Sequence, residues 1–193
     1  NISLEELERA IRPDTVLVSM MLVNNELGTI LPVAEAAKII KGSGSPALLH
    51  CDAVQGFLKV PFTPKQLGVD FLSVSGHKIH APKGIGAMYI RKGLKVPALI
   101  RGGGQENGLR SGTEPTAQIA AFAAAAQAGA ATLKEDLEHM AQLKAYAVER
   151  LQQAVPTVKV LVEEGPNAVV NLVGMGVPFD VDDEGGLLIT REG

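Results

Sequence analysis

Short apolar runs that each end in polar residues divide the first half of the chain, and this pattern constrains the fold more than any other feature. The runs are Val16–Val23, Ala47–Asp52 and Phe71–Val74. The first is apolar almost throughout, as in a parallel strand covered on both faces. Between the first two, Pro32 and apolar residues at helical spacing predict an amphipathic helix that stops at Gly42. Strand, helix and strand form the βαβ unit of a parallel sheet, so the sequence predicts an α/β fold.

A lysine and an aspartate stand where two of these strands end. Lys78 follows Phe71–Val74 closely, and Asp52 ends the strand Ala47–Asp52. Because parallel sheets place ligands beyond the carboxyl ends of their strands, the two side chains converge if the strands are neighbours. Pyridoxal phosphate requires such a pair, since a lysine amine forms its Schiff base and a carboxylate keeps its pyridine nitrogen protonated. Taken singly, each residue is more often a solvated loop lysine or a turn aspartate.

Further polar residues surround this pair in the sequence. Ser75 and His77 flank the lysine with hydrogen-bond donors that suit the cofactor phosphate, and Gln55 is placed to donate to its phenolic oxygen. His50 shares the strand face of Asp52, so we expect it either near the site or packed in the core. The sequence therefore predicts one polar cluster at the carboxyl edge of the sheet.

Composition limits the classes of function. The 193 residues are 46% hydrophobic and 20% charged, as in an ordinary soluble globular protein, and the net charge of -3 gives no sign of nucleic-acid binding. No apolar run approaches the roughly 18 residues of a membrane span and no leader opens the chain, so we expect a cytoplasmic protein. The single cysteine, Cys51, excludes an internal disulfide and a cysteine-based metal site. It points away from Asp52 along its strand, so we expect a small buried residue.

Beyond the predicted sheet, a strand is expected at Gly86–Arg91 and one more is considered at Ala98–Ile100. The glycines Gly102–Gly104 lack the spacing and the strand-to-helix context of a dinucleotide site. Thr113 is expected to cap the helix that follows it, and helix N-termini attract phosphate. The start of this helix is therefore a second place where the sequence predicts contact with an anion.

The remainder of the chain is predicted to be mostly helical. Apolar residues at helical spacing continue past an interruption at Gly129, and strands are expected at residues 157–162 and 168–173. We therefore divide the chain into residues 1–130, part of a cofactor-binding large domain, and residues 131–193, a linking helix with an incomplete small domain.

Five segments together resemble the motifs of one enzyme family. They are Val23–Thr29, His50–Gln55, Ser75–Lys78 with Pro82–Gly86, Gly102–Glu106 and Leu109–Glu114. In order and spacing they closely resemble motifs of the cysteine desulfurases, which are class V aminotransferase-like, fold-type I pyridoxal phosphate enzymes. The resemblance implies the C-terminal half of the large domain, a three-layer α/β sandwich with a mainly parallel sheet, plus the start of a small α+β domain.

The resemblance also assigns roles to residues. It makes Lys78 the catalytic and cofactor-binding lysine, and it makes Asn25 a contact of the cofactor or substrate, with an Asx turn into Gly28 as the alternative. It implies that Thr113 reaches the cofactor phosphate of a partner subunit, so the protein would be a homodimer with shared sites. For Arg110, an interface salt bridge and a phosphate or substrate role stay open.

The function implied is that of a cysteine desulfurase. Such an enzyme converts L-cysteine to L-alanine and passes the sulfur through an enzyme persulfide to an acceptor protein, for iron-sulfur cluster or thio-cofactor synthesis. Two alternatives stay open: a selenocysteine lyase or another class V lyase or aminotransferase, and a truncated chain that folds and dimerises without catalysis. Because the only cysteine is the inward-facing Cys51, we expect little or no activity from this chain alone.

Overall fold

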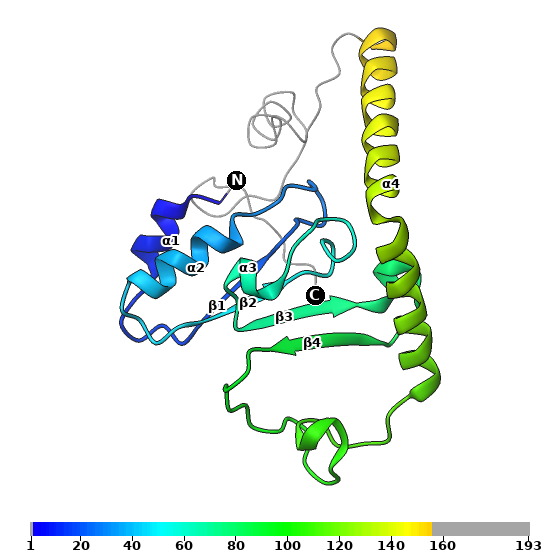
Figure 1. The fold of residues 1–193 in the computed structure, drawn as a ribbon. Helices are drawn as coiled ribbons and strands as arrows, with labels where there is room; N and C mark the ends of the chain where they lie inside the picture. Colours follow the sequence, from blue (N-terminus) through cyan, green and yellow to red (C-terminus); the bar gives the residue numbers. More distant parts are fainter. Residues whose placement is uncertain (1, 156–193) are drawn as a thin grey trace, which may run out of the picture. The chain divides into compact units, whose positions relative to one another are not determined.

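The computed structural model describes residues 2–155, which contain a four-stranded sheet and the helices around it (Figure 1). The elements in chain order are α1 (Leu4–Ala10), β1 (Leu17–Met21), α2 (Val33–Gly42), β2 (Leu48–Asp52), α3 (Pro64–Leu67), β3 (Phe71–Ser75), η1 (Gly76–Ile79), β4 (Gly86–Ile90), η2 (Gln105–Gly108) and α4 (Thr116–Ala154). The elements η1 and η2 are single 3₁₀ turns. Backbone contacts group residues 1–142 into one compact unit. The predicted boundary after residue 130 stays a prediction.

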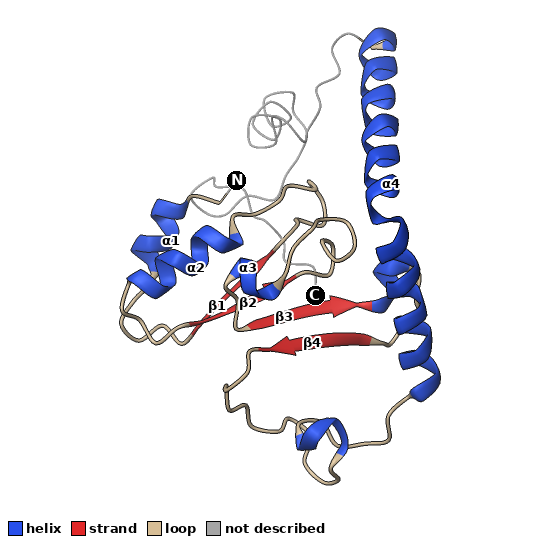
Figure 2. Ribbon diagram, viewed as in Figure 1, coloured by secondary structure: helices blue, strands red, loops and turns tan. Residues whose placement is uncertain are grey.

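The strands lie in the order β1-β2-β3-β4, coloured red in Figure 2. β1, β2 and β3 are parallel, whereas β4 runs antiparallel to β3. Only residues 80–85 connect η1 to β4, which is too short a segment for the crossover that a parallel neighbour needs. The predicted α/β fold with a mainly parallel sheet is therefore confirmed. The strands predicted at Val16–Val23, Ala47–Asp52, Phe71–Val74 and Gly86–Arg91 match β1 to β4 within two residues at each end, and the predicted helix between the first two strands is α2.

Side chains of β1, β2 and β3 alternate between two faces of the sheet. The inner face packs against α2, which also contacts α1, and both helices lie on the same side of the sheet (Figure 1). Its buried strand residues are Met20, Leu49, Cys51 and Leu72. The outer face carries Leu17, Ser19, Met21, Leu48, His50, Asp52, Phe71, Ser73 and Ser75, none of them buried.

This alternation differs from one expectation. The continuous apolar run at β1 predicted burial on both faces, but Leu17 on the outer face is 52% exposed within the described residues. The reason is that α2, which contacts β2, and α1, which contacts α2, both lie on the inner side of the sheet. Polar residues on the outer face are thus left accessible at the edge where Asp52 lies.

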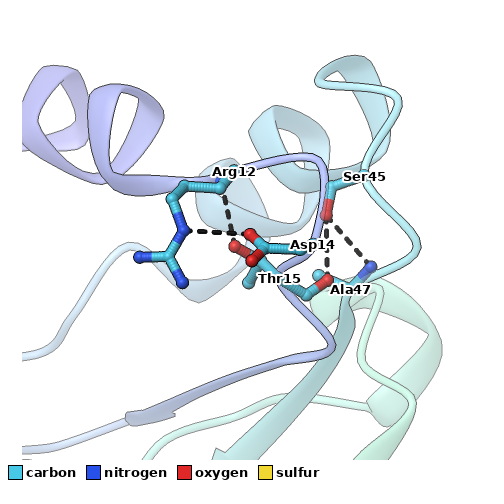
Figure 3. Close-up of polar contacts among 5 residues, drawn as sticks. All are labelled: Arg12, Asp14, Thr15, Ser45 and Ala47. Carbon is cyan, nitrogen blue, oxygen red and sulfur yellow. Dashed lines mark hydrogen bonds and ion pairs between the residues drawn. The ribbon is translucent and has the colours of Figure 1, made fainter.

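Polar contacts join the amino ends of β1 and β2 (Figure 3). Arg12 forms a 2.9 Å ion pair with Asp14, and its backbone N–H donates to Thr15 Oγ1 over 2.9 Å. Ser45 Oγ donates to the Thr15 carbonyl oxygen over 3.0 Å and accepts from the Ala47 N–H over 3.3 Å. These contacts hold the starts of the two strands together, at the end of the sheet opposite the predicted site.

The two amino-terminal helices have local start signals. Ser3 Oγ accepts a 3.2 Å hydrogen bond from the Glu6 N–H and so caps α1. Pro32 directly precedes α2, where the sequence predicts that helix to begin. The strand considered at Ala98–Ile100 does not form: in the described part of the chain this segment contributes only an isolated bridge between Ile100 and Arg110.

The long helix α4 corrects a second expectation. It runs from Thr116 to Ala154 without a break at Gly129. A Cβ at Gly129 would stand 2.9 Å from Leu58 Cδ1, so the missing side chain permits close packing rather than ending the helix. No helix among residues 2–155 has the combination of length and apolar character that a bilayer crossing requires. The strands expected at residues 157–162 and 168–173 lie outside the described residues.

Candidate functional site

Lys78 is half-buried on the η1 turn that directly follows β3. The Gly76 N–H donates to the Ile85 carbonyl over 2.8 Å, and the Ala81 N–H donates to the Gly76 carbonyl over 3.0 Å. A Cβ at Gly76 would lie 2.8 Å from Ile85 Cγ2 and 3.0 Å from its carbonyl oxygen, so the turn closes only around glycine. Lys78 is therefore presented by a turn that is bonded to the start of β4.

Ser75 directly precedes this turn and His77 lies within it, and the two side chains contact each other. Ser75 Oγ lies 2.8 Å from His77 Nδ1. When this nitrogen accepts from the hydroxyl, the proton sits on Nε2, which is then a donor for a further group. The two residues that the sequence assigns to the phosphate thus form one polar pair beside Lys78.

Asp52 ends β2 at the same edge of the sheet. β2 is the parallel neighbour of β3, and Asp52 pairs with Ser73 in the register. Its Oδ1 accepts from the Val54 N–H over 2.9 Å, while the Ala53 N–H donates to the Ser73 carbonyl over 2.9 Å. The carboxylate is therefore held at the carboxyl edge from which Lys78 also emerges. Gln55, half-buried, lies in the turn that begins here.

Cys51 faces the opposite way, as predicted. It is fully buried on the inner face. Burial, together with the charge of Asp52, raises the pKa of its thiol to about 12. Since the thiolate is the reactive form, Cys51 is a structural residue rather than a nucleophile.

Lys59 is a site residue that the sequence analysis missed. It lies in the turn after β2, where its N–H donates to the Gly56 carbonyl over 3.0 Å. Burial, and after it the positive charge of Lys78, lower the pKa of the Lys59 amine. The only sequence signal is its position in the loop that leaves the carboxyl end of β2. This edge thus carries two amines that interact electrostatically, along with the anchored carboxylate.

The turn after β1 brings Asn25 near this edge. The Leu22 N–H donates to the Asp52 carbonyl over 2.8 Å, so the chain leaving β1 runs beside the end of β2. Asn24, not Asn25, makes the Asx turn, because its Oδ1 accepts from the N–H groups of Glu26 and Leu27 over 3.0 and 2.8 Å. The Asn25 side chain is exposed, and its role toward a cofactor or substrate stays a prediction.

Thr113 lies in the segment between η2 and α4. It is exposed, and no hydrogen bond within residues 2–155 joins it to Asp52 or Lys78. Its expected role as a helix cap is wrong, since α4 begins only at Thr116 and Pro115 precedes it directly. Its role toward a cofactor phosphate stays a prediction.

The glycine-rich segment before Thr113 is tied to itself. The Gly103 N–H donates to Ser111 Oγ over 2.5 Å, and the Gly112 N–H donates to Gln105 Oε1 over 3.2 Å. Arg110 Nη1 donates to the Gly112 carbonyl over 3.0 Å, and Arg110 lies 3.6 Å from the Glu106 carboxylate. The bonds of Arg110 found here are within its own loop, so its role toward substrate stays open.

Comparisons with known proteins agree with this geometry. Residues 1–184 match the family model described as aminotransferase class-V. The chain is 45% identical over 159 residues to the mitosomal cysteine desulfurase of Trachipleistophora hominis and 42% identical over 159 residues to the human cysteine desulfurase. Each alignment covers 81% of this chain. The fold also matches a solved NifS-like protein with a TM-score of 0.76 and 38% identity, over 94% of this chain and 53% of that one.

These matches have a defined extent. The chain spans 36% of the length of the Trachipleistophora protein and 34% of the human protein. The match to the family model, over residues 1–184, includes the βαβ unit, the Asp52 edge and the Lys78 turn described above. The family match, the similarity to cysteine desulfurases and the α/β fold of NifS-like enzymes together show that the chain belongs to the aminotransferase class-V family.

Proposed function

We propose that this chain carries the lysine-bearing part of the active site of a pyridoxal phosphate-dependent cysteine desulfurase. One observation supports this most directly: Asp52 and Lys78 leave the carboxyl ends of two adjacent parallel strands, with the Ser75–His77 pair between them in the sequence. Similarity to proteins named cysteine desulfurase supports the choice of reaction.

The residues at this edge have the chemistry that pyridoxal phosphate needs. An amine is presented on a fixed turn, a carboxylate is anchored by a backbone N–H, and a serine–histidine pair offers donors for a phosphate. When bound, the cofactor supplies an electron sink for negative charge that develops on the substrate carbon. The donor set therefore fits the group.

Each residue then has one task. Lys78 would hold the cofactor through Nζ and would move protons to and from the substrate. Asp52 would hold the proton on the ring nitrogen, and Gln55 would donate to the phenolic oxygen. Ser75 and His77 would orient the phosphate. In a homodimer, Thr113 of a second chain would add a donor to that phosphate, and Asn25 would contact the cofactor or the substrate.

The proposed substrate is L-cysteine, whose sulfur would pass to an acceptor protein for iron-sulfur cluster or thio-cofactor synthesis. A solved relative, 42% identical to this chain, is described as a complex with cysteine. The buried Cys51, with its raised thiol pKa, is not suited to accept that sulfur. For this chain by itself we therefore favour cofactor binding with little or no desulfuration. A cytoplasmic location stays a prediction, since one relative is named mitosomal.

The test is covalent attachment of the cofactor to the purified 193-residue chain. After addition of pyridoxal phosphate and reduction with borohydride, peptide mass spectrometry should find the cofactor on Lys78. Lys78→Ala should lose it, whereas Lys83→Ala, at an exposed lysine in the next loop, should keep it. Attachment spread over many lysines, or unchanged in Lys78→Ala, would refute the proposal.

Alanine formation from L-cysteine in the presence of a thiol reductant is the second measurement. Little alanine is expected from this chain. Rapid turnover would show that the buried Cys51 does not limit the reaction, and rapid release of selenide from selenocysteine without sulfide from cysteine would favour the lyase alternative.

A further inference from the structure

A histidine on the outer face bridges three strands. His50, in the middle of β2, places Nδ1 2.7 Å from Ser19 Oγ of β1 and Nε2 2.8 Å from Ser73 Oγ of β3. Both ring nitrogens thus meet a hydroxyl, and in the neutral ring one donates while the other accepts. The bridge adds side-chain bonds to the backbone ladder across β1, β2 and β3.

The bridge lies next to the residues proposed to bind the cofactor, two residues earlier along β2 and β3. His50 and Asp52 are two residues apart on one strand, so they share the outer face, as do Ser73 and Ser75 on the next strand. Ser73 is also the register partner of Asp52. The contact between His50 Nε2 and Ser73 therefore joins β2 to β3 close to their carboxyl ends, where Asp52 and the Ser75–Lys78 turn lie.

The backbone ladder between β2 and β3 is short at this point. The register of the two strands comprises the pairs His50–Phe71, Cys51–Leu72 and Asp52–Ser73. Beyond it, the Ala53 N–H donates to the Ser73 carbonyl over 2.9 Å, and β3 continues to Ser75 while the chain after β2 enters a turn. On the inner face, packing of Leu49 and Cys51 against the core fixes the side chains, but the outer-face residues are only partly covered within the described chain. The Ser19–His50–Ser73 bridge adds a side-chain contact on this face that resists displacement of β3 against β2.

We propose that His50 is a positioning residue, which through Ser73 sets the placement of Asp52 relative to the Ser75–Lys78 turn. The inference rests on the proposed function, since it concerns the cofactor that those residues would hold. Its physical basis is that bound groups tolerate little displacement: a shift of about 1 Å far from the chemistry can cost roughly 100-fold in rate. The contact to Ser19 anchors the ring on β1, whereas the contact to Ser73 transmits its position to the site.

The two serines provide a matched test. Ser19→Ala and Ser73→Ala each remove one hydroxyl from the same ring, on opposite sides. The affinity for pyridoxal phosphate is measured by absorbance titration, and the stability of the cofactor-free chain by urea denaturation. We expect Ser73→Ala to weaken the affinity about tenfold, the equivalent of one net hydrogen bond, and Ser19→Ala to change it less than about threefold.

Two substitutions of the histidine sharpen the test. The amide of His50→Gln reaches the place of Nε2 and keeps a partner for Ser73, whereas the amide of His50→Asn reaches the place of Nδ1 and keeps one for Ser19. His50→Gln should therefore retain most of the affinity and the wild-type pH dependence of the bound cofactor's absorbance. His50→Asn should behave like Ser73→Ala in both measurements.

The outcomes separate this proposal from the proposed function. Covalent attachment to Lys78 with equal affinities in Ser19→Ala and Ser73→Ala would leave the function standing and overturn the role of His50. The two serine variants could also lose stability equally, with cofactor affinity falling only in proportion to that loss. The bridge would then be purely structural, and the proposed role of His50 would be overturned. If the wild-type chain binds no cofactor at Lys78, the proposed function fails and this proposal fails with it.

Discussion

The two faces of the sheet are built by different physical means. The inner face of β1, β2 and β3 is apolar and is buried against α2, with Leu49 only 2% exposed. The outer face of the same strands is half-exposed and carries the Ser19–His50–Ser73 bridge and Asp52. Successive residues of one strand therefore serve opposite purposes: burial on one side stabilises the fold, and hydrogen bonds on the other orient polar groups.

This difference explains why neighbouring residues should respond differently to substitution. Burial of an aliphatic side chain contributes about 1.5–3 kcal/mol to stability, whereas a net hydrogen bond contributes about 0.5–1.5 kcal/mol. Changes on the inner face should thus act mainly on unfolding, and changes on the outer face mainly on the binding of the cofactor. Substitutions at neighbouring inner-face and outer-face positions test this difference between unfolding and cofactor binding.

The largest expected effect concerns Leu49 and its neighbour Leu48. Leu49→Ala removes a fully buried side chain and leaves a cavity, so the free energy of unfolding should fall by about 2–5 kcal/mol. Leu48→Ala alters the half-exposed face and should cost about 1 kcal/mol or less. Urea denaturation of the two variants measures both values. Equal losses would show that the outer face is packed as tightly as the inner one.

Gly86 should affect both fold and site. A Cβ at this position would stand 2.5 Å from the Val74 carbonyl oxygen, and Gly86 pairs with Ser75 in the antiparallel register. Gly86→Ala should therefore destabilise the chain by about 1–3 kcal/mol and weaken cofactor binding as β4 is pushed away. Gly104→Ala is the control, since nothing lies within 4 Å of its added Cβ. A neutral Gly86→Ala would contradict the close approach of the two strands.

Cys51 and Asp52 test the two faces at adjacent positions. Cys51→Ser buries a hydroxyl in the core and should lower the free energy of unfolding by about 1–2 kcal/mol without loss of cofactor attachment. Asp52→Asn should do the reverse, with little change in stability and weaker cofactor binding. Denaturation and absorbance titration separate these results. Loss of cofactor in both variants would mean that the faces are not independent.

The same thiol should resist chemical modification. Burial raises the pKa of the Cys51 thiol to about 12, so the reactive thiolate is scarce at pH 8, and the side chain is also shielded from reagents. A chromogenic disulfide reagent should therefore react with Cys51 only after the chain is unfolded in urea. Rapid reaction of the native chain would show that the inner face of the sheet becomes accessible to the reagent without unfolding.

The smallest expected effect is a change in titration. The charge of Lys78 contributes to the lowered pKa of Lys59, so Lys78→Met should raise that pKa part of the way to its ordinary value. Lys83→Met should leave it unchanged. Nuclear magnetic resonance of labelled lysine side chains measures both. If the Lys59 pKa is unchanged in Lys78→Met, the two amines do not interact.

The sign of the linked effect on stability follows from the same shift. The folded chain binds the Lys59 proton more weakly than the unfolded chain does, because burial and Lys78 disfavour the charged amine. The charged Lys59 amine therefore lowers the free energy of unfolding, in full, at any pH below its pKa in the folded chain. The free energy of unfolding rises as the pH increases from that pKa toward the ordinary pKa of lysine. In Lys78→Met this rise should be smaller, since the folded and unfolded pKa values lie closer together.

Local patterns in the sequence were sufficient for the parallel strands and their ends. Apolar runs of strand length, separated by a helical pattern and followed by polar residues, predict β1, α2, β2 and β3, and they place Asp52 and Lys78 at one edge. These features depend on side-chain alternation and on short-range helix and turn preferences, which act within a few residues of sequence. The opposite orientation of Cys51 follows from the same alternation.

Other features depended on contacts between residues far apart in the sequence. Gly129 is expected from local propensity to interrupt a helix, but α4 runs through it, and Leu58 from another part of the chain lies where a side chain at this position would stand. The polar role of His50 arises only when β1 and β3 bring Ser19 and Ser73 to its two ring nitrogens. The lowered pKa of Lys59 likewise requires the turn after β2 to lie near Lys78. Sequence determined which strands form and where they end, whereas the pairing of those strands decided which side chains meet, because such contacts exist only after the chain has folded.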